Sequence, residues 1–387
     1  MWRQTLFNPV VFGLALLSAG CAAQSGPAID AVEAIDPPVL AVGQAPSLRK
    51  TLDALPDDRI VFVGETHTRY DHHLVQLEVL KFMQRKFGDV ALGVEWFQFP
   101  FQQALDDYVA GRITEAQMLA RTGYFDRWQF DYRLYRPIMQ YARDAGIPIV
   151  ALNAPVELTR QIGQGGLDSL TADARAMLPH TYGPVGARYR ARVREAFDAH
   201  PPQGQSFDHF FTVMQTWDET MAKRAADHLD AHPGRRLVVL AGSGHVMFGD
   251  GIPERLERRT GIRGARLLVG AEHAGTPGVA DFIVLSQEQM LPPAGMLGVF
   301  LDSQEGSVKV KGLTDSGALK AAGLEKDDVI LAIDDTPTPD FATLKLVLLG
   351  RAPGEQIMVR YRHEGELAPP VENTVAVTLG DAKPRHH

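Results

Sequence analysis

The chain has 387 residues, of which 45% are hydrophobic and 22% are charged, and its formal net charge is −8. That length is enough for about two or three domains with a sizeable core. The excess of acidic side chains, with no run of Lys or Arg, argues against a nucleic-acid surface. We therefore expect no nucleic-acid partner.

Residues 1–21 have the pattern of a targeting segment. Arg3 precedes an apolar stretch, 10–17, that is too short to span a bilayer. The stretch ends in Leu17-Ser18-Ala19-Gly20-Cys21, and small residues directly before a lone Cys resemble a bacterial lipobox. Cys21 is the single cysteine, so it has no partner for an intrachain disulfide. We predict a lipoprotein signal peptide with lipid attachment at Cys21; an ordinary signal peptide is the alternative.

The residues after Cys21 give an indication of the cellular location. A lipid on this cysteine would anchor the mature protein to a membrane without a transmembrane helix. Ala22 follows it, and no Asp is there to indicate retention in the inner membrane. We expect a lipid-anchored protein of the cell envelope, in the outer membrane and facing the periplasm or the cell surface. Residues 22–47 are rich in Ala, Pro, Gly and Gln and are predicted to be a flexible tether.

From residue 59 onward, short apolar runs alternate with helical patterns. Runs that are apolar on both faces are typical of buried parallel strands. Strands that alternate with helices indicate βαβ units. We therefore predict an α/β fold with a mainly parallel sheet flanked by helices. The expected strands are 60–63, 90–94, 147–152, 237–241, 265–269 and 282–285.

About 85 residues with almost no strand signal separate the third and fourth of these strands. Three stretches within them, 168–178, 185–198 and 207–229, have helical patterns. Such a length exceeds a plain crossover. We predict a helical insertion that lies over the carboxyl edge of the sheet.

Chemically active side chains follow three of the predicted strands. Glu65 and His67 come after the first strand, Glu95 follows the second, and His245 comes after the fourth. Ligands of open α/β sheets bind outside the carboxyl ends of the strands. We predict that these four residues form one cluster, able to act in acid–base catalysis or to hold a divalent metal. The alternative is a hydrogen-bonded network that braces the turns.

Two other polar features are assigned structural roles. His72 and His73 lie on the next predicted helix, and adjacent residues there do not share a face. We expect at most one to turn inward and the pair to lie at the surface. Ser243 lacks the Gly-x-Ser-x-Gly context of a nucleophile, so it is predicted to be a turn residue.

Pro292-Pro293 marks a boundary, after which strand-like runs and two short helical segments predict a small β-barrel-like domain. The run 316–324, Ser-Gly-Ala-Leu-Lys-Ala-Ala-Gly-Leu, followed by 327–334, resembles a PDZ domain of the bacterial HtrA type. The resemblance covers about 294–380 and implies an enlarged hairpin loop near 368–370. It also implies that a peptide C-terminus binds to the backbone of a loop formed by Met296, Leu297, Gly298 and Val299.

Residues 48–290 resemble the ChaN family of haem-binding lipoproteins, within a group that includes erythromycin esterases and Tiki metalloproteases. The resemblance rests on separated motifs, namely 64–67, 93–95, Tyr135 with Pro137, 141–143, 151–153, Gln215, 218–222, and 242–246 leading to 251–253. It implies haem binding at a cell surface, a tyrosinate axial ligand and a homodimer that holds stacked haems. The candidate ligands are Tyr132, Tyr135 and Tyr182, since the matching motifs do not decide between them.

Two functions remain open at this point. One is a membrane-anchored protein that binds haem, for iron acquisition or haem handling, and recruits a partner peptide through the PDZ domain. The other is a hydrolase, related to the esterases or proteases, that uses Glu65, His67, Glu95 and His245 with activated water and a divalent metal. The sequence therefore leaves open whether the protein is an enzyme.

Overall fold

The computed structural model describes residues 42–55, 59–128, 130–199, 204–304, 307–363 and 371–381. The predicted signal peptide, Cys21, most of the predicted tether and the predicted loop at 368–370 lie outside these residues. Within the described chain, no helix is both long enough and apolar enough to cross a membrane. The first described elements are η1 (Val42–Gln44) and α1 (Leu48–Ala54).

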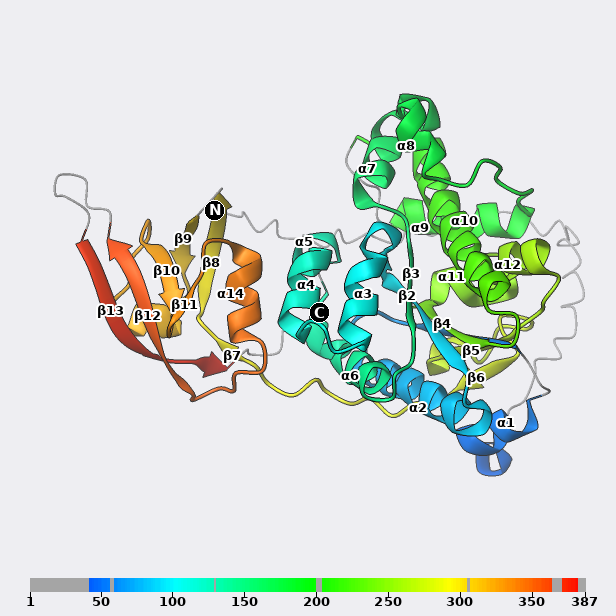
Figure 1. Ribbon diagram of the computed structural model, residues 1–387, viewed down its shortest axis with the longest axis horizontal. Helices are drawn as coiled ribbons and strands as arrows, with labels where there is room; N and C mark the ends of the chain where they lie inside the picture. Colours follow the sequence, from blue (N-terminus) through cyan, green and yellow to red (C-terminus); the bar gives the residue numbers. More distant parts are fainter. Residues whose placement is uncertain are drawn as a thin grey trace, which may run out of the picture. The chain divides into compact units, whose positions relative to one another are not determined.

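The larger domain is built on a six-stranded sheet whose described pairs are all parallel. The strand order is β3-β2-β4-β1-β5-β6 (Figure 1). The predicted mainly parallel sheet is thus confirmed, although β2 extends beyond the predicted strand. The strands are β1 (Ile60–Glu65), β2 (Val90–Gln98), β3 (Ile149–Asn153), β4 (Arg236–Gly242), β5 (Ala265–Val269) and β6 (Phe282–Val284).

Helices cover both faces of this sheet. Val61 and Val63 belong to a core shared with α2 (Tyr70–Phe87) and α6 (Arg136–Asp144). Ile60 and Phe62 point to the opposite face, into a core shared with α10 (Phe207–Ala231) and α12 (Ile252–Thr260). Because both faces are covered, successive strand residues are all buried, which explains why the runs are apolar throughout.

Helices also fill the two longest connections (Figure 1). Between β3 and β4, helices precede α10 and confirm the predicted helical insertion. The connection between β2 and β3 is helical as well, and it carries the aromatic side chains that flank the site. The elements of the first connection are α7 (Val156–Gly165), η4 (Leu167–Ser169), α8 (Ala172–Ala176) and α9 (Ala187–Ala199). Those of the second are η2 (Phe99–Phe101), α3 (Gln102–Val109), α4 (Glu115–Thr122), α5 (Tyr124–Arg127) and η3 (Tyr132–Leu134), which are followed by α6.

Short segments complete this domain. The single turn α11 (Ser243–Val246) follows β4 directly and is continued by η5 (Met247–Gly249). A further turn, η6 (Ala271–His273), connects β5 to β6. The α11 turn matters for function because it contains His245 at the carboxyl edge of the sheet.

The C-terminal domain has its own hydrophobic core and an antiparallel sheet, as the PDZ resemblance implies. The sheet order is β13-β12-β10-β9-β8, so β8 lies at an edge. Its elements are β7 (Gly295–Met296), β8 (Val299–Gln304), β9 (Ser307–Leu313), α13 (Ala318–Ala321), β10 (Val329–Ile333), β11 (Thr336–Pro337), α14 (Phe341–Leu348), β12 (Gln356–His363), β13 (Val371–Thr378) and β14 (Gly380–Asp381).

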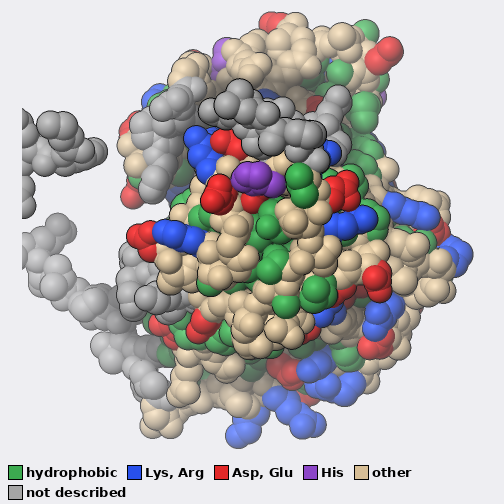
Figure 2. All heavy atoms as spheres, turned by 90° about the vertical axis from the view of Figure 1, so that its left-hand side faces the viewer, with side chains coloured by type: hydrophobic (Ala, Val, Ile, Leu, Met, Phe, Trp, Pro, Cys, Tyr) green, Lys and Arg blue, Asp and Glu red, His purple; other side chains and the backbone are tan. Residues whose placement is uncertain are grey.

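Figure 2 shows the face on the side of β12 and β13. Acidic and basic side chains lie there in mixture, with apolar side chains among them. The exposed apolar side chains of this domain include Phe300, Met358 and Val371, which are 56%, 43% and 55% exposed. Exposure of single apolar residues is ordinary, but Phe300 stands out because it lies on the edge strand β8.

Candidate functional site at the carboxyl edge of the sheet

Three adjacent strands, β2, β4 and β1, deliver the predicted cluster. Glu65 ends β1 and is in register with Gly242 at the end of β4. Glu95 lies in β2, on the other side of β4. His67 follows β1, and His245 follows β4 within α11. The structure therefore brings all four predicted residues together at one edge of the sheet.

His67 is the most accessible member of the cluster, with 27% of its side chain exposed. Its Nδ1 lies 2.6 Å from Oε1 of Glu65, so this nitrogen carries a proton and donates it to the carboxylate. Among the described residues, the one hydrogen bond of this imidazole is that of Nδ1, and its Nε2 is left open. A carboxylate that fixes one nitrogen of an imidazole and leaves the other free is the usual arrangement of a metal-binding histidine.

Aromatic rings and negative charge surround this imidazole. The ring centroids of Trp128 and Phe130 lie 5.0 and 4.8 Å from that of His67. Burial lowers the pKa of His67, but the hydrogen bond to Glu65 and the charges of Glu65 and Glu95 outweigh it, so the pKa is raised. His67 is thus flanked by aromatic rings and lies close to the two carboxylates of Glu65 and Glu95.

His245 lies between two buried carboxylates. Its Nδ1 is 2.7 Å from Oδ1 of Asp218, and its Nε2 is 3.3 Å from Oε1 of Glu95. Burial lowers the pKa of His245, yet the charges of Glu95 and Asp218 raise it to about 10. His245 is therefore an imidazolium at neutral pH. Its charge keeps Glu95 ionised rather than leaving that buried carboxyl to take up a proton.

Gly242 allows the two halves of the cluster to approach each other. Its backbone N–H donates to Oε2 of Glu95 at 2.7 Å. A Cβ atom at this position would lie 2.9 Å from Cε1 and 3.2 Å from Nε2 of His67. Any side chain would therefore have to displace the imidazole, and glycine is needed here for close approach rather than for an unusual backbone angle.

His73 adds a second imidazole to Glu65. Gln76 donates its Nε2–H to the Val63 carbonyl, so its Oε1 faces Nδ1 of His73 at 3.0 Å. Nε2 of His73 lies 3.2 Å from the His67 carbonyl oxygen. Both ring nitrogens of His73 therefore face an acceptor oxygen. Oε2 of Glu65 lies 3.8 Å away and, although buried, has no hydrogen-bond partner among the described residues.

The expectation that His72 and His73 lie at the surface is wrong. Both are buried, and Nδ1 of His72 accepts from the Thr66 backbone N–H. Adjacent helical residues point about 100° apart, but the first turn of α2 is enclosed on more than one side. His72 meets the turn after β1, while the ring of His73 lies 4.4 Å from that of Tyr135.

The three tyrosine candidates occupy different places. Tyr135 touches the cluster: its hydroxyl lies 3.5 Å from the His67 carbonyl oxygen. The buried Tyr132 donates to Glu115, and the partly exposed Tyr182 shares a hydrogen bond with Thr216. Burial raises the pKa of all three phenols, which opposes formation of a tyrosinate. The choice of a ligand among them stays a prediction.

Sequence reasoning missed the outer part of the network. Asp218, on α10, is fully buried and accepts a 2.6 Å hydrogen bond from the Tyr189 hydroxyl through Oδ2. Arg255 lies 3.9 Å from the same oxygen atom. The available signal was the motif 218–222 of the ChaN resemblance, from which Asp218 was not assigned to the site.

The predicted peptide site is the loop that connects β7 to β8. Met296 ends β7, and Gly298 has a φ of 67°. The carbonyls of Leu297 and Gly298 accept from Leu319 and Thr314. Their own N–H groups donate to no residue that the structure describes. Two consecutive N–H groups without partners suit the binding of a carboxylate.

A family model supplies the assignment of the larger domain. The family described as haem-binding uptake, Tiki superfamily, ChaN matches residues 51–256. The chain belongs to this family. A PDZ-domain model matches residues 295–369. The ChaN-like and PDZ resemblances seen in the sequence are both confirmed.

Individual proteins are more distant. The Arabidopsis thaliana protein RETICULATA-RELATED 5, chloroplastic, is 24% identical over 240 residues, which are 57% of this chain and 32% of that protein. The chain therefore spans about a third of this relative. The structure described as cofacial heme binding to ChaN of Campylobacter jejuni is 14% identical, with a TM-score of 0.47, and covers 62% of this chain and 92% of that one. The HtrA-type protease AlgW with a decapeptide is 21% identical, with a TM-score of 0.21, and covers 24% of this chain and 30% of that one.

Proposed function

We propose that this protein binds haem at the carboxyl edge of the sheet and recruits a partner peptide through its PDZ domain. The observation that carries the haem proposal is the open Nε2 of His67, within a domain of a haem-binding family. A histidine nitrogen beside aromatic rings is a common setting for haem iron. Trp128 and Phe130 supply those rings.

The donor set fits such a group. Iron in haem supplies ligand binding or electron transfer, depending on the residues around it. Glu65 would fix the orientation and the proton of His67, leaving Nε2 as the donor atom. Tyr135 lies behind the His67 backbone, where it can position this residue. These contacts favour His67 as the ligand, a residue that is not among the three tyrosine candidates.

Titration of the mature chain with hemin tests this proposal. We expect a shifted Soret band for the natural sequence and at least a tenfold loss of affinity in His67→Ala. His232→Ala, at an exposed histidine of the same domain, serves as the matched control. A spectrum identical to that of free hemin would contradict haem binding, and an unaffected His67→Ala variant would contradict the assigned ligand.

A specific observation favours a second candidate, a metal-dependent hydrolase. One ligand atom from each of Glu65, His67 and Glu95 can be chosen so that all three lie within 4.8 Å of one another. Carboxylate and imidazole ligands of this number suit a catalytic zinc site that leaves a position for water. The buried Oε2 of Glu65 has no hydrogen-bond partner among the described residues, so this oxygen atom can serve as a cation ligand. Zinc binding measured by calorimetry without hemin, together with an unshifted hemin spectrum, would favour this candidate.

The cellular role belongs to the same proposal. We infer lipid attachment at Cys21, placement in the outer membrane, and a part in iron acquisition or haem handling. The lipobox-like sequence before Cys21 supports the anchor. A homodimer would allow haems of two chains to meet. Light scattering of the protein with and without hemin tests this, since a haem-linked dimer should double in mass only when hemin is added.

A further inference from the structure

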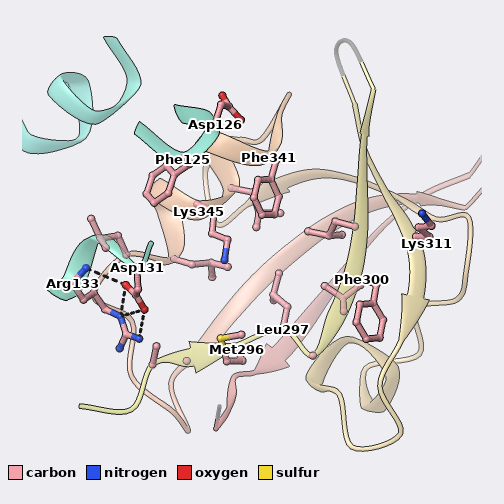
Figure 3. Close-up of a pocket in the computed structure, with 18 of the residues that line it drawn as sticks. Phe125, Asp126, Asp131, Arg133, Met296, Leu297, Phe300, Lys311, Phe341 and Lys345 are labelled. Atoms are coloured by element: carbon pink, nitrogen blue, oxygen red, sulfur yellow. Dashed lines mark hydrogen bonds and ion pairs between the residues drawn. The ribbon is translucent and has the colours of Figure 1, made fainter. Parts of the chain in front are cut away.

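The side chains that line the PDZ groove can select peptides by features other than the terminal carboxylate. The groove lies beside the edge strand β8 and helix α14, and among the described strands β8 pairs on one side only, with β9. A peptide can therefore add as a new strand along β8. Figure 3 shows the labelled side chains Leu297, Phe341 and Lys345 in this region. The residues of this domain that line the groove include Met296, Leu297, Phe300, Lys311, Phe341 and Lys345.

The loop fixes the direction of a bound peptide. The free N–H groups of Leu297 and Gly298 lie just before the start of β8, so the peptide carboxylate sits there and the peptide runs antiparallel to β8. The Gly295 N–H donates to the Arg351 carbonyl, which follows α14, so the C-terminal end of this helix lies near the loop. Peptide residues farther from the C-terminus therefore lie nearer the N-terminal end of α14, where Phe341 is.

Alternation of side chains then assigns the subsites. In an extended peptide, the last residue and the residue two positions earlier point to the same side. The side chain of the last peptide residue points toward the apolar core of the domain, where Leu297 and Leu344 are 4% and 2% exposed. The residue two positions earlier lies one turn farther along α14. There the groove is lined by Phe341 and by Lys345, whose Nζ lies 5.2 Å from the Phe341 ring centroid.

The lysines of the groove carry free charge. Within the described chain, neither Lys311 nor Lys345 has a carboxylate within 4.0 Å, whereas Lys309 pairs with Asp327 at 3.2 Å. The nearby carboxylate of Asp340 is engaged at the N-terminus of α14, where it accepts from the Thr343 N–H at 2.7 Å. Among the described lining residues of the C-terminal domain, the groove therefore presents positive charge without a paired carboxylate.

Lys311 lies on the other side of a bound strand. The register of β8 with β9 passes from Phe300–Gly312 to Leu301–Val310, so Lys311 falls in a bulge. Both Lys311 and Phe300 are exposed. A peptide along β8 would therefore run between two ammonium groups, that of Lys345 on the helix side and that of Lys311 on the sheet side.

We propose that this groove selects C-terminal peptides with an apolar last residue and an acidic residue two positions before it, which pairs with Lys345. Lys311 adds to the same preference for an acidic peptide. This inference rests on the proposed peptide-binding function of the PDZ domain. The partner is thus a protein with an acidic, apolar-ended C-terminus.

Fluorescence anisotropy with the purified full chain tests the proposal. The probes are labelled ten-residue peptides ending in Val, identical except for Glu, Gln or Lys two positions before the end. We expect the Glu peptide to bind about two- to fivefold more tightly than the Gln peptide, as for an exposed ion pair. The difference should shrink in about 1 M salt. In Lys345→Glu, the Lys peptide should become the tightest of the three.

The control and the opposing outcomes separate this inference from the function on which it rests. Lys326→Glu makes the same charge change at an exposed lysine before β10, outside the groove lining, and should keep the preference for Glu. Equal binding of the Glu and Gln peptides, or an unchanged preference in Lys345→Glu, would overturn the inference. Failure of every peptide to bind, or equal binding of a C-terminally amidated peptide, would instead overturn the carboxylate-loop function.

Discussion

The Nε2 atom of His245 lies 3.3 Å from Oε1 of Glu95, and both side chains are buried. Burial raises the pKa of Glu95, but the charge of His245 outweighs it, so the pKa of this carboxyl falls to about 2. The same pair contributes to a His245 pKa of about 10. Because each group sets the charge of the other, the two titrate as one coupled unit.

This pair makes the free energy of unfolding depend on pH in both the acidic and the alkaline range. The raised pKa of His245 gives a contribution that is full below its ordinary value of 6.5 and is lost as the pH rises to about 10. The lowered pKa of Glu95 gives a contribution that is full above 4.5 and is lost as the pH falls to about 2. We expect the free energy of unfolding in urea, from this pair, to be highest between pH 4.5 and 6.5.

His245→Gln tests the alkaline side of this dependence. At pH 6 the variant should be less stable by about 3–5 kcal/mol, because Glu95 and Asp218 lose their buried cation. The difference should narrow as the pH rises to about 10. His232→Gln, at an exposed position, is the control and should follow the natural protein. A difference that stays constant from pH 6 to pH 10 would contradict the assigned imidazolium.

Glu65→Gln should weaken ligand binding without abolishing it. The amide keeps the shape of Glu65 but removes the charge that orients His67 and supports its basicity. Loss of such a partner typically lowers metal affinity about 10- to 100-fold. Hemin and zinc titrations measure this change. Glu78→Gln, at a half-exposed glutamate on α2, should bind as the natural protein does; equal affinity of Glu65→Gln would show that His67 does not act through Glu65.

A double-mutant cycle tests whether His67 and His245 act as one unit. The two residues are linked through Glu95, whose charge raises the pKa of both imidazoles. Neighbouring residues of one network show coupling of about 0.5–3 kcal/mol. We expect the losses of ligand affinity in His67→Ala and His245→Ala to be non-additive, with circular dichroism as the folding control. Strictly additive losses would mean that His245 stabilises the turn and does not act together with His67 on the ligand.

Much of the site was predictable because parallel strands end at a common edge. Glu65, Glu95, His67 and His245 follow strands that are apolar on both faces, so their convergence could be expected. The sequence does not reveal that β4 inserts between β2 and β1, which places Gly242 against His67. Strand order depends on how crossovers pack, and several orders satisfy the same apolar pattern.

The residues that sequence reasoning missed are those whose role depends on tertiary contacts. Asp218 lies 27 residues before His245 along the chain, on a helix of another layer. His73 was expected at the surface because helical spacing alone gives no sign that a second layer covers its face. The aromatic stretch that holds Trp128 and Phe130 was by contrast open to prediction as a wall of a haem slot, with core packing as the alternative, but its contact with His67 depends on how the connection between β2 and β3 packs.

Cys21→Ser tests the anchor. Serine cannot form the thioether that joins a diacylglycerol to the lipoprotein cysteine, so the variant should lose lipid labelling. It should remain as an uncleaved precursor or leave the membrane fraction. Fractionation with metabolic fatty-acid labelling measures both results. Unchanged lipid labelling and membrane partitioning would refute the lipobox.

Gly242→Ala should damage the site through a single methyl group. The added Cβ would lie 2.9 Å from Cε1 of His67, closer than carbon atoms approach in packed proteins, so the imidazole has to move. Because Glu65 fixes Nδ1 and Trp128 and Phe130 flank the ring, this movement should turn Nε2 away from its ligand position. We expect at least a tenfold loss of hemin or zinc affinity, measured by titration. Gly244→Ala, where a Cβ would meet nothing within 4 Å, is the matched control and should bind normally. Equal affinities of the two variants would show that the ligand does not depend on the placement of the His67 ring.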